Sequence, residues 1–256
     1  MSASVGALPH AVEGFDPEVN LRDLGGWPTA DGRVVRPGLI FRSSRLDVLD
    51  VDELVRLQQL GLACVVDLRP EGEAAAHPDP RFPSIRHVQA DAGREVLAAE
   101  ALDGASPDEV VDALAANTAA MAFGNAGAAR VLGLLEQGEA PLLFHCNSGR
   151  DRSGVVAMVV LMALGCSDDV LLADYLLTNA YRARSLAYLE EQYADVLRLG
   201  EAYRPLVTVM AGVLEQAGRA VLGAIDAAYP SRAAYLRKEY GLDERRLSLL
   251  RARYLR

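Results

Sequence analysis

Short apolar runs of strand length lie only in the first 145 residues of the chain. Their β-branched and aromatic content, and the turn residues that bound them, predict β-strands. An Asp-Gly pair at Asp31-Gly32 adds a hairpin signal next to the first of them. The predicted strands cover residues 34–35, 39–41, 64–68, 85–89 and 142–144.

Apolar residues at helical spacing dominate the chain after Ser167, as in the set Leu171, Leu172 and Tyr175. Earlier helices are marked by their starts, because Ser106-Pro107-Asp108-Glu109 combines a capping pair with proline at the first helical position. The predicted helices cover residues 50–61, 106–123, 125–138, 155–164, 186–199, 206–217, 219–229, 232–240 and 244–254.

Strands before residue 145 and long helices mostly after it predict an α/β fold, with a central four- or five-stranded sheet flanked by helices. No linker rich in Pro, Gly or Ser interrupts the chain, so we expect one domain over residues 1–256. Residues 1–19 should form a loose N-terminal arm. Residues 182–220 hold many apolar residues at helical spacing. Two interpretations of them stay open, ordinary core packing or a helical lid over a pocket.

The segment from His145 to Gly154, HCNSGRDRSG, carries the candidate chemistry. A cysteine is followed six positions later by an arginine, with a glycine between them and Ser-Gly directly after. A strand leads into the segment and a long apolar helix leads out, so it should form a tight loop at a helix start. Backbone N–H groups at a helix start bind anions and lower the pKa of a thiol held there.

We therefore expect Cys146 to be a nucleophile and Arg152 to hold two oxygens of a phosphate. The backbone N–H groups of the loop should wrap the phosphate, and a glycine without a Cβ permits the close approach. The hydroxyl after Arg152 should ease departure of the sulfur in the second step, and His145 should order the loop through hydrogen bonds. The expected phosphate-binding residues are Asn147, Ser148, Gly149, Arg150 and Ser153.

Three carboxyls compete as the acid that protonates the leaving group. Asp151 lies inside the loop and is favoured, although two flanking arginines should keep its pKa low until a phosphate dianion raises it. Asp91 follows the strand 85–89 and is the competitor, and Asp67, at the end of the strand 64–68, is more often structural. Arg150 is either a solvated surface arginine or a contact to a second phosphate or acidic group on the substrate.

The composition of the chain limits the classes of molecule that it is expected to bind. The chain has 256 residues, 51% of them hydrophobic, with a net charge of −9 and a pI near 5.0. The hydrophobic content suffices for a core, and the negative charge argues against a general nucleic-acid or anionic-membrane surface. Three scattered cysteines, Cys64, Cys146 and Cys166, do not make a disulfide framework or a zinc site and fit a reducing compartment.

The N-terminal residues show no basic region followed by an apolar one, so no signal peptide is visible. No apolar run reaches the roughly 18 residues of a membrane-spanning helix. We expect a cytoplasmic protein without stable membrane insertion. Secretion by a signal-free route would leave no mark in the sequence.

Four segments in chain order, NLRDLGG at 20–26, RPGL at 36–39 followed by Arg42-Ser43, VDLR at 66–69 and the loop itself, carry a resemblance. They are similar to the protein tyrosine phosphatase superfamily, and within it to the bacterial tyrosine/serine branch of dual-specificity phosphatases. The resemblance runs from about residue 18 to the end. It implies a phosphatase fold with helical lid elements over the active site, and the aspartate inside the loop as the acid.

Two departures from that family concern the loop, because the family lysine is Arg150 here and the family threonine is Ser153. Lysine there is associated with phosphoinositide as well as phosphotyrosine hydrolysis, whereas arginine keeps the charge and changes the donor geometry. Serine should preserve the role of the hydroxyl. Asn20, Arg22 and Asp23 could touch the rim of the active site, although turn chemistry explains the aspartate equally well.

The sequence predicts a cysteine-dependent phosphomonoester hydrolase that acts through a phosphocysteine. Its expected partner is a phosphorylated protein, with phosphotyrosine first and phosphoserine, phosphothreonine and phosphoinositides as further substrates. One alternative is a phosphate-binding pseudophosphatase, and another is a phosphoinositide phosphatase. No feature implies a metal or an organic cofactor, and the oligomeric state stays open.

Overall fold

A single mixed sheet of five strands organises the computed structural model, which describes residues 8–93 and 104–256. The strand order is β1-β2-β5-β3-β4, with four parallel strands and β1 antiparallel at one edge. The predicted α/β class with a central sheet is therefore confirmed, at five strands. The strands are β1 (Arg22–Asp23), β2 (Ile40–Ser43), β3 (Cys64–Asp67), β4 (Arg86–Gln89) and β5 (Leu142–His145).

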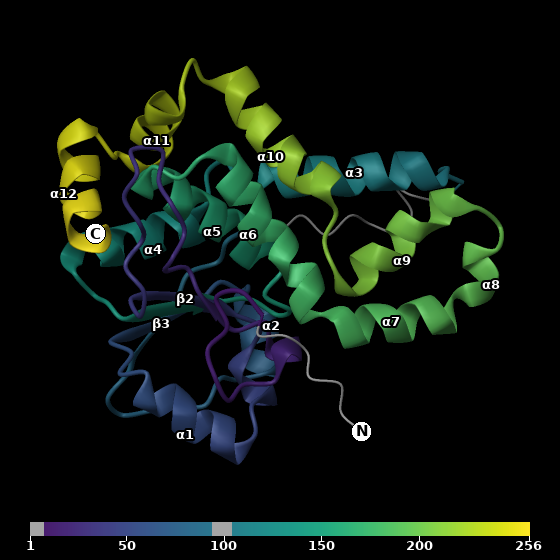
Figure 1. Cartoon of the computed structure of the whole chain (residues 1–256), viewed down its shortest axis with the longest axis horizontal. Helices are drawn as coiled ribbons and strands as arrows, with labels where there is room; N and C mark the ends of the chain where they lie inside the picture. Colours follow the sequence, from purple (N-terminus) through teal and green to yellow (C-terminus); the bar gives the residue numbers. More distant parts are fainter. Residues whose placement is uncertain (1–7, 94–103) are drawn as a thin grey trace.

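Helices cover both faces of the sheet, with α1 on one side and α4, α5 and α6 on the other (Figure 1). A further group, α7 to α9, extends to the side of this body and is joined back to it by α10 (Figure 1). The helices are α1 (Val51–Gln59), α2 (Glu71–Ala76), α3 (Pro107–Ala120), α4 (Ala126–Gln137), α5 (Asp151–Leu164), α6 (Asp168–Tyr181), α7 (Ala183–Gln192), α8 (Ala194–Leu197), α9 (Arg204–Ala211), α10 (Glu215–Ala228), α11 (Arg232–Tyr240) and α12 (Glu244–Tyr254).

The two faces of the sheet bury separate apolar clusters because successive side chains on a strand point to opposite sides. Val65 and Leu143 pack with Leu57 of α1 on one face. Val66 and Phe144 belong to the larger cluster on the other face, with α4, α5 and α6. The central strands are thus buried on both faces. This packing holds β5 in position, together with the loop that follows it.

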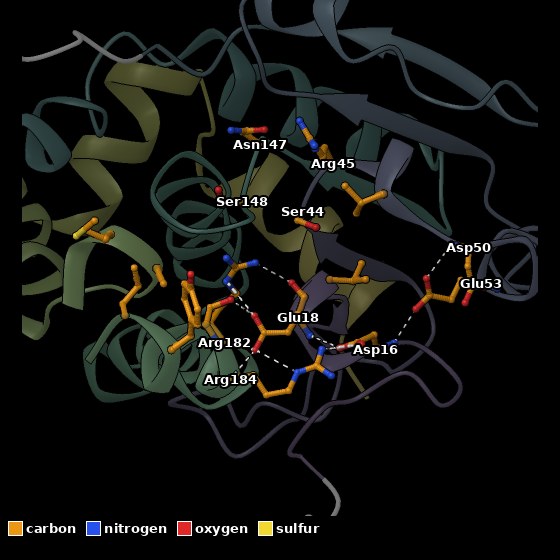
Figure 2. Close-up of a pocket in the computed structure, with 17 residues that line it drawn as sticks. Asp16, Glu18, Ser44, Arg45, Asp50, Glu53, Asn147, Ser148, Arg182 and Arg184 are labelled. Carbon is orange, nitrogen blue, oxygen red and sulfur yellow. Dashed lines mark hydrogen bonds and ion pairs between the residues drawn. The ribbon is translucent and has the colours of Figure 1, made fainter. Parts of the chain in front are cut away.

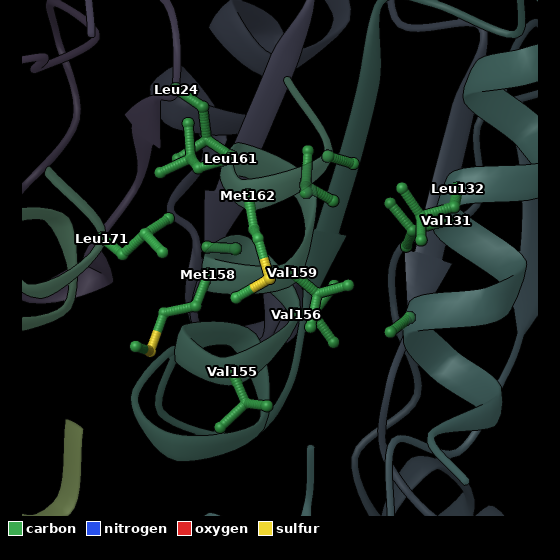
Figure 3. Packing of buried hydrophobic residues seen from close by; sticks show 14 of the residues in the cluster. Leu24, Val131, Leu132, Val155, Val156, Met158, Val159, Leu161, Met162 and Leu171 are labelled. Carbon is green, nitrogen blue, oxygen red and sulfur yellow. The ribbon is translucent and has the colours of Figure 1, made fainter. Parts of the chain in front are cut away.

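Helix α5 is apolar on every side because it is enclosed on every side. All residues from Arg152 to Leu164 are buried. Figure 3 shows the α5 side chains, among them Val159 and Met162, between Leu132 of α4 and Leu171 of α6. This packing anchors the helix whose first turn carries the arginine of the HCNSGRDRSG loop.

Some predicted elements differ from the observed ones. Residues 34–35 form only isolated bridges to Pro28 and Leu255. The two-residue β1 and the short α2 were not predicted. The predicted helix 186–199 divides at Tyr193 into α7 and α8.

The predicted helix 206–217 divides at Gly212, between α9 and α10. The physical reason is a side chain from α6. Asn179 donates to the Val213 carbonyl (3.0 Å) and accepts from the Val213 N–H (2.8 Å), so it replaces the backbone bonds of a continuous helix. Only the packing of α6 against this segment makes that possible.

The expected loose N-terminal arm is packed from residue 8 onward, and residues 1–7 lie outside the described part. The Tyr181 hydroxyl donates to the Pro9 carbonyl (2.9 Å), and His10 stacks on Trp27 at 4.2 Å between ring centroids. A short 3₁₀ turn, Pro17–Val19, follows and buries Val19. The segment therefore joins the body instead of extending from it.

Within the described residues, no single helix is long and apolar enough to cross a membrane. One pair of segments bent by 79°, Glu201–Ala211 with Glu215–Ala228, meets the length and composition requirement together. Apolar residues of α10, including Val221 and Ile225, are buried in the core.

Candidate active site

Cys146 is the first residue after β5, at the carboxyl end of the central strand of the sheet. β5 lies between β2 and β3, and both neighbours run parallel to it. The chain turns through residues 146–150 and enters α5 at Asp151. The predicted strand, loop and helix are therefore present, and Cys146 is only 3% exposed.

The carbonyls of the loop are held on its outer side. Asn20 and Arg42 donate side-chain hydrogen bonds to the Gly149 carbonyl at 2.9 and 2.8 Å, and the Arg45 N–H donates to the Asn147 carbonyl at 3.1 Å. In the described part of the chain, no backbone N–H of residues 147–150 donates to another protein group. A ring of free donors is an anion site.

A buried ion network holds Asn20 and Arg42 in place. The carboxylate of Asp174 in α6 forms ion pairs with Arg22 Nε at 3.2 Å and with Arg42 Nη1 at 2.5 Å. All three side chains are fully buried. Arg22 also donates to the Asn20 amide oxygen. Two residues of the NLRDLGG segment therefore support the loop from behind, whereas Asp23 accepts from turn backbone, as turn chemistry predicted.

Gly149 is required by a close approach of protein backbone as well as by its own conformation. Its φ is 66°, and a Cβ at this position would lie 2.7 Å from the carbonyl of Ser43 in β2. From the sequence, the glycine was expected because a phosphate must approach the loop closely. The fold adds a second reason, which is the close approach of Ser43 in the neighbouring strand β2.

Burial alone would raise the pKa of the Cys146 thiol, but two neighbours outweigh it. The positive charge of Arg152 and polar contacts from the Ser153 hydroxyl and N–H hold that pKa below its ordinary value. In the described structure the Ser153 hydroxyl has no other protein partner, so it can turn toward the sulfur. The site favours a thiolate.

Arg152 is 4% exposed, and its guanidinium is held by a residue that the sequence analysis did not single out. Glu73 of α2 accepts from both terminal nitrogens of Arg152, at 3.2 and 2.8 Å. This bidentate pair fixes the plane of the arginine fork at the edge of the pocket. The two glutamates at the start of α2 are the only sequence signal, and acidic residues are common at helix starts.

The three candidate acids occupy different surroundings. Asp151 begins α5 and lines the cavity above Cys146. Asp91 is exposed beyond β4, bonds the Gly93 N–H at 2.9 Å, and is among the charges that act on Arg152.

The third candidate, Asp67, is turned away from that cavity. Both of its carboxylate oxygens accept from Arg69, at 2.9 and 2.7 Å. A carboxylate held in this way is structural, and it does not line the cavity above Cys146.

Arg150 joins the loop to the helices beside it. Its guanidinium donates to the carbonyls of Val209 and Gly212, at 2.8 and 3.2 Å, at the C-terminal end of α9. Helix C-termini present unpaired carbonyls and attract cations. Both hydrogen bonds come from Nη1, and Arg150 also lines the cavity over Cys146.

Two adjacent cavities share Asn147 and Ser148 in their walls. The smaller, about 460 Å³, lies over Cys146 between α2 and the loop. The larger, about 920 Å³, lies between the N-terminal 3₁₀ turn and α7, with charged walls (Figure 2). Figure 2 shows Arg184 and Arg182 meeting Asp16 and Glu18 across it.

The two other cysteines belong to the core. Burial raises the pKa of Cys64 to about 11 and that of Cys166 to about 12. Cys64 is in register with Leu142, at the opposite end of β5 from Cys146, and Cys166 follows the far end of α5. Neither is placed to form a disulfide with Cys146.

Asp67, Asp79 and His145 offer possible metal-ligand atoms within 4.8 Å of one another. The guanidinium of Arg69 donates to both carboxylates, at 2.7 Å to Asp67 and 3.0 Å to Asp79. A cation is thus already supplied by the protein, and these residues do not fit a metal without displacing it.

Comparison with known proteins shows the family to which the chain is similar. A family model described as "Tyrosine phosphatase family" matches residues 14–256. The chain is 34% identical over 261 residues to a Cupriavidus necator protein named as a tyrosine-protein phosphatase, covering 94% of this chain and 87% of that protein. It is 30% identical over 267 residues to the triple specificity protein phosphatase PtpB of Mycobacterium tuberculosis, covering 91% of this chain and 95% of that protein.

Among solved structures, the chain overlaps the crystal structure of Pseudomonas aeruginosa TpbA in complex with phosphotyrosine. The TM-score is 0.33 and the identity 18%, over 65% of this chain and 78% of that one. The whole-chain matches to the family model and to the two curated relatives are far more extensive. They agree with the resemblance carried by the four sequence segments.

Proposed function

We propose, on the premise that this chain belongs to the tyrosine phosphatase family and is a protein-tyrosine phosphatase, that Cys146 carries the reaction through a phosphocysteine. One observation supports this most strongly. A buried thiol with a lowered pKa lies inside a ring of unpaired backbone N–H groups, with a fixed arginine beside it. This arrangement suits a nucleophile attacking a phosphate held by its oxygens.

In the first step the Cys146 thiolate attacks phosphorus in line with the ester oxygen. A sulfur–phosphorus bond forms, the phosphorus–oxygen bond breaks, and the departing oxygen takes a proton from an acid. The N–H groups of residues 147–152 and the Arg152 fork hold the three equatorial oxygens. In the second step water attacks phosphorus, the deprotonated acid takes its proton, and the thiolate leaves with help from the Ser153 hydroxyl.

Asp151 is the acid we propose. It lines the cavity above Cys146, whereas Asp91 is exposed beyond β4 and Asp67 is fully engaged by Arg69. Asp151 also lines a small second cavity together with Tyr175.

We propose phosphotyrosine as the first substrate, with phosphoserine, phosphothreonine and phosphoinositides as further ones. The breadth is supported by the relative named as a triple specificity phosphatase, and by the larger cavity beside the thiol, which offers room for groups that flank the phosphate. A main activity on phosphoinositides would need a second phosphate to meet Arg150, which lines the cavity over Cys146 while its Nη1 donates to α9 carbonyls. A pseudophosphatase is disfavoured because the cysteine, the arginine and the aspartate are all present.

We further propose one domain over residues 1–256, in which residues 182–220 act as a lid. The lid proposal rests on the hydrogen bonds from Arg150 to the end of α9, which tie these helices to the catalytic loop. A cytoplasmic location is proposed because the three cysteines are free in the described structure and a thiolate nucleophile needs a reducing compartment.

The covalent step is tested with Cys146→Ser. This variant should lose turnover while phosphate ligands still bind, because the loop N–H groups and Arg152 remain. Rapid acid quench of the native chain with a labelled phosphotyrosine peptide should trap one phosphoryl group on Cys146. Turnover by Cys146→Ser, or label on another residue, would contradict the mechanism.

Substrate breadth is tested by steady-state hydrolysis of a phosphotyrosine peptide, a phosphoserine peptide and soluble phosphoinositides, in reductant without metal. We expect phosphotyrosine to be turned over with the highest kcat/KM. Preference for phosphoinositides would make lipid phosphates the main substrate. Binding of phosphate ligands without turnover of any substrate would favour the pseudophosphatase.

A further inference from the structure

Four charged side chains form a buried cluster beneath the nucleophile. Asp67 and Arg69 lie at the end of β3, His145 ends β5, and Asp79 follows α2. None of these side chains is more than 10% exposed. Asp79 was not among the residues that the sequence singled out, and it contacts no substrate-facing group directly.

Both ring nitrogens of His145 face hydrogen-bond acceptors. Nδ1 lies 3.2 Å from the carbonyl oxygen of Cys146, and Nε2 lies 2.8 Å from a carboxylate oxygen of Asp79. A carbonyl can only accept, and so can an ionised carboxylate. The second Asp79 oxygen accepts from Arg69 at 3.0 Å, which favours the ionised form. Both ring nitrogens of His145 must then carry hydrogens.

Charge balance leads to the same protonation state. Asp67 and Asp79 contribute two negative charges and Arg69 one positive charge, so a buried cluster of these three would be left with a net negative charge. Buried charges are tolerated when they are paired. A protonated His145 makes the cluster neutral.

The other groups that face His145 do not change this balance. From β4, His87 has a buried Nε2 with no partner in the described structure, and burial, followed by the charge of Arg81, lowers its pKa, so it stays neutral. From β2, the residue in register is the uncharged Ser43. The remaining group is Cys146 itself, which follows His145 directly.

The pKa directions agree with this geometry. Burial alone would lower the pKa of His145, but the hydrogen bond and charge of Asp79 raise it above its ordinary value. Burial alone would raise the pKa of Asp79, but His145 and Arg69 lower it. A raised folded-state pKa means that His145 keeps its proton above the pH at which free imidazole loses it.

We propose that Asp79 is a positioning residue that keeps His145 doubly protonated beneath the loop, and that this imidazolium stabilises the Cys146 thiolate. The imidazolium donates to the Cys146 carbonyl and places a positive charge one residue from the sulfur. The proposal rests on the cysteine mechanism proposed above. Asp79 acts through His145 and takes no part in the bond changes at phosphorus.

The protonation state is tested directly by nitrogen-15 NMR of the histidine rings in the full chain. The protein has four histidines, so His145→Gln identifies the resonances of His145. At pH 7.5 we expect His145 to show two protonated ring nitrogens in the native chain and a neutral ring in Asp79→Asn. A neutral His145 ring in the native chain would overturn the proposal.

The effect on the nucleophile is tested by the rate at which iodoacetamide alkylates Cys146 as a function of pH. Cys64 and Cys166 are buried with raised pKa values and should not react in the same range. In Asp79→Asn the midpoint should move to higher pH. If the pKa of the thiol rises by about one unit, alkylation should be about tenfold slower at pH values well below both midpoints. At high pH the rates of both proteins should converge.

Three matched variants separate this mechanism from a general structural role. Asp67→Asn removes a charge from the same cluster but no bond to His145, so its shift should be smaller. Asp79→Glu keeps the charge and should retain the native midpoint. Asp79→Asn combined with His145→Gln should shift the midpoint no further than His145→Gln alone. Equal shifts in Asp67→Asn and Asp79→Asn would overturn the role assigned to the hydrogen bond.

The two proposals fail in different ways. If alkylation of native Cys146 leaves turnover intact, the cysteine mechanism is wrong. If alkylation inactivates the native chain but Asp79→Asn keeps the native midpoint, only the role of Asp79 is wrong. If Asp79→Asn does not fold, the NMR state of the native chain and the midpoint of Asp79→Glu decide the proposal.

Discussion

The back of the catalytic loop and the helices α7 to α9 on its other side are built in opposite ways. Behind the loop, Arg22, Arg42 and Asp174 are fully buried and joined by ion pairs and hydrogen bonds. In α7 and α8 no residue is buried, and Tyr188 and Leu199 are 61% and 72% exposed. The first region is held by buried charges, whereas α7 and α8 are held by surface contacts and only α9 buries residues, Val207 and Ala211.

This difference suits a loop that must stay rigid during the reaction and helices that can move. A loop that must present N–H groups to a phosphate cannot reorganise during the reaction without losing rate, so its supports are buried and ion-paired. Helices with few buried contacts open at low free-energy cost, as lids require. Arg150 is the only residue of the loop itself with side-chain hydrogen bonds to the proposed lid, residues 182–220, in the described structure.

The largest effect is expected where the two regions meet, at Asp151. Asp151→Asn removes the proposed acid and should slow hydrolysis of a phosphotyrosine peptide by about 10²- to 10⁴-fold. An aryl phosphate with a good leaving group needs little protonation and should lose far less. Steady-state kcat on both substrates measures this, with Asp91→Asn as the control. A larger selective loss in Asp91→Asn would transfer the role to that residue.

The loop side of the comparison is tested by Asp174→Ala. Two buried arginines would lose their counter-charge, so the free energy of unfolding should fall by about 3–5 kcal/mol, measured by urea denaturation. Asp31→Ala breaks an exposed ion pair with Arg33 and should leave the midpoint almost unchanged. Similar losses in both variants would contradict the distinction between the two regions.

Lowering the pH should weaken the same network, because it protonates Asp174. Burial alone would raise the pKa of Asp174, but Arg22 and Arg42 lower it below the value in the unfolded chain. A lowered folded-state pKa stabilises the fold above the unfolded pKa of about 4, and this contribution disappears as pH falls through the folded value. The native chain should therefore lose stability below about pH 4, and Asp174→Ala should lack this component.

The link between the regions is tested by Arg150→Met, which keeps a long side chain but donates no hydrogen bonds. Amide exchange in residues 183–214 should become faster, with the opening free energy reduced by about 1.5–3 kcal/mol, the range for hydrogen bonds from a charged donor. Arg198→Met removes an exposed arginine from the same lid and should leave exchange unchanged. Unchanged exchange in Arg150→Met would show that this contact does not hold the lid.

The smallest effect is expected on the exposed surface of the lid. Leu199→Ser should change the free energy of unfolding by no more than about 0.5 kcal/mol, because the side chain is already 72% exposed. Leu161→Ala in α5 is the matched contrast, since Leu161 is completely buried and the truncation should cost about 2–5 kcal/mol. Thermal denaturation of both variants would measure the difference.

Much of the fold was predictable because it depends on short patterns of neighbouring residues. Strands β3 and β5 are short apolar or β-branched runs between turn residues, and the caps Ser106 and Asp50 mark the starts of α3 and α1. The errors occur where a distant residue decides. Asn179 breaks the predicted helix at Gly212, and the chain end at Leu255 takes the pairing of Val35.

The candidate site shows the same division. Cys146, Arg152 and Asp151 were predicted because they are close in sequence and need one strand, one loop and one helix start. Glu73 and Asp79 were missed because a lone carboxylate in a loop or short helix has no distinguishing pattern, and each acts on a partner at least 66 residues away.

The sequence by itself determined the candidate reacting residues, the α/β class and the family resemblance, because each depends on a local pattern of residue types. Only the tertiary structure decided which charges surround those residues. The Asp174 network behind the loop, the Glu73 clamp on Arg152 and the Asp79 contact to His145 all join separate segments. Electrostatic interactions depend on distance in space and on burial, and neither is encoded in the order of residues along a short segment.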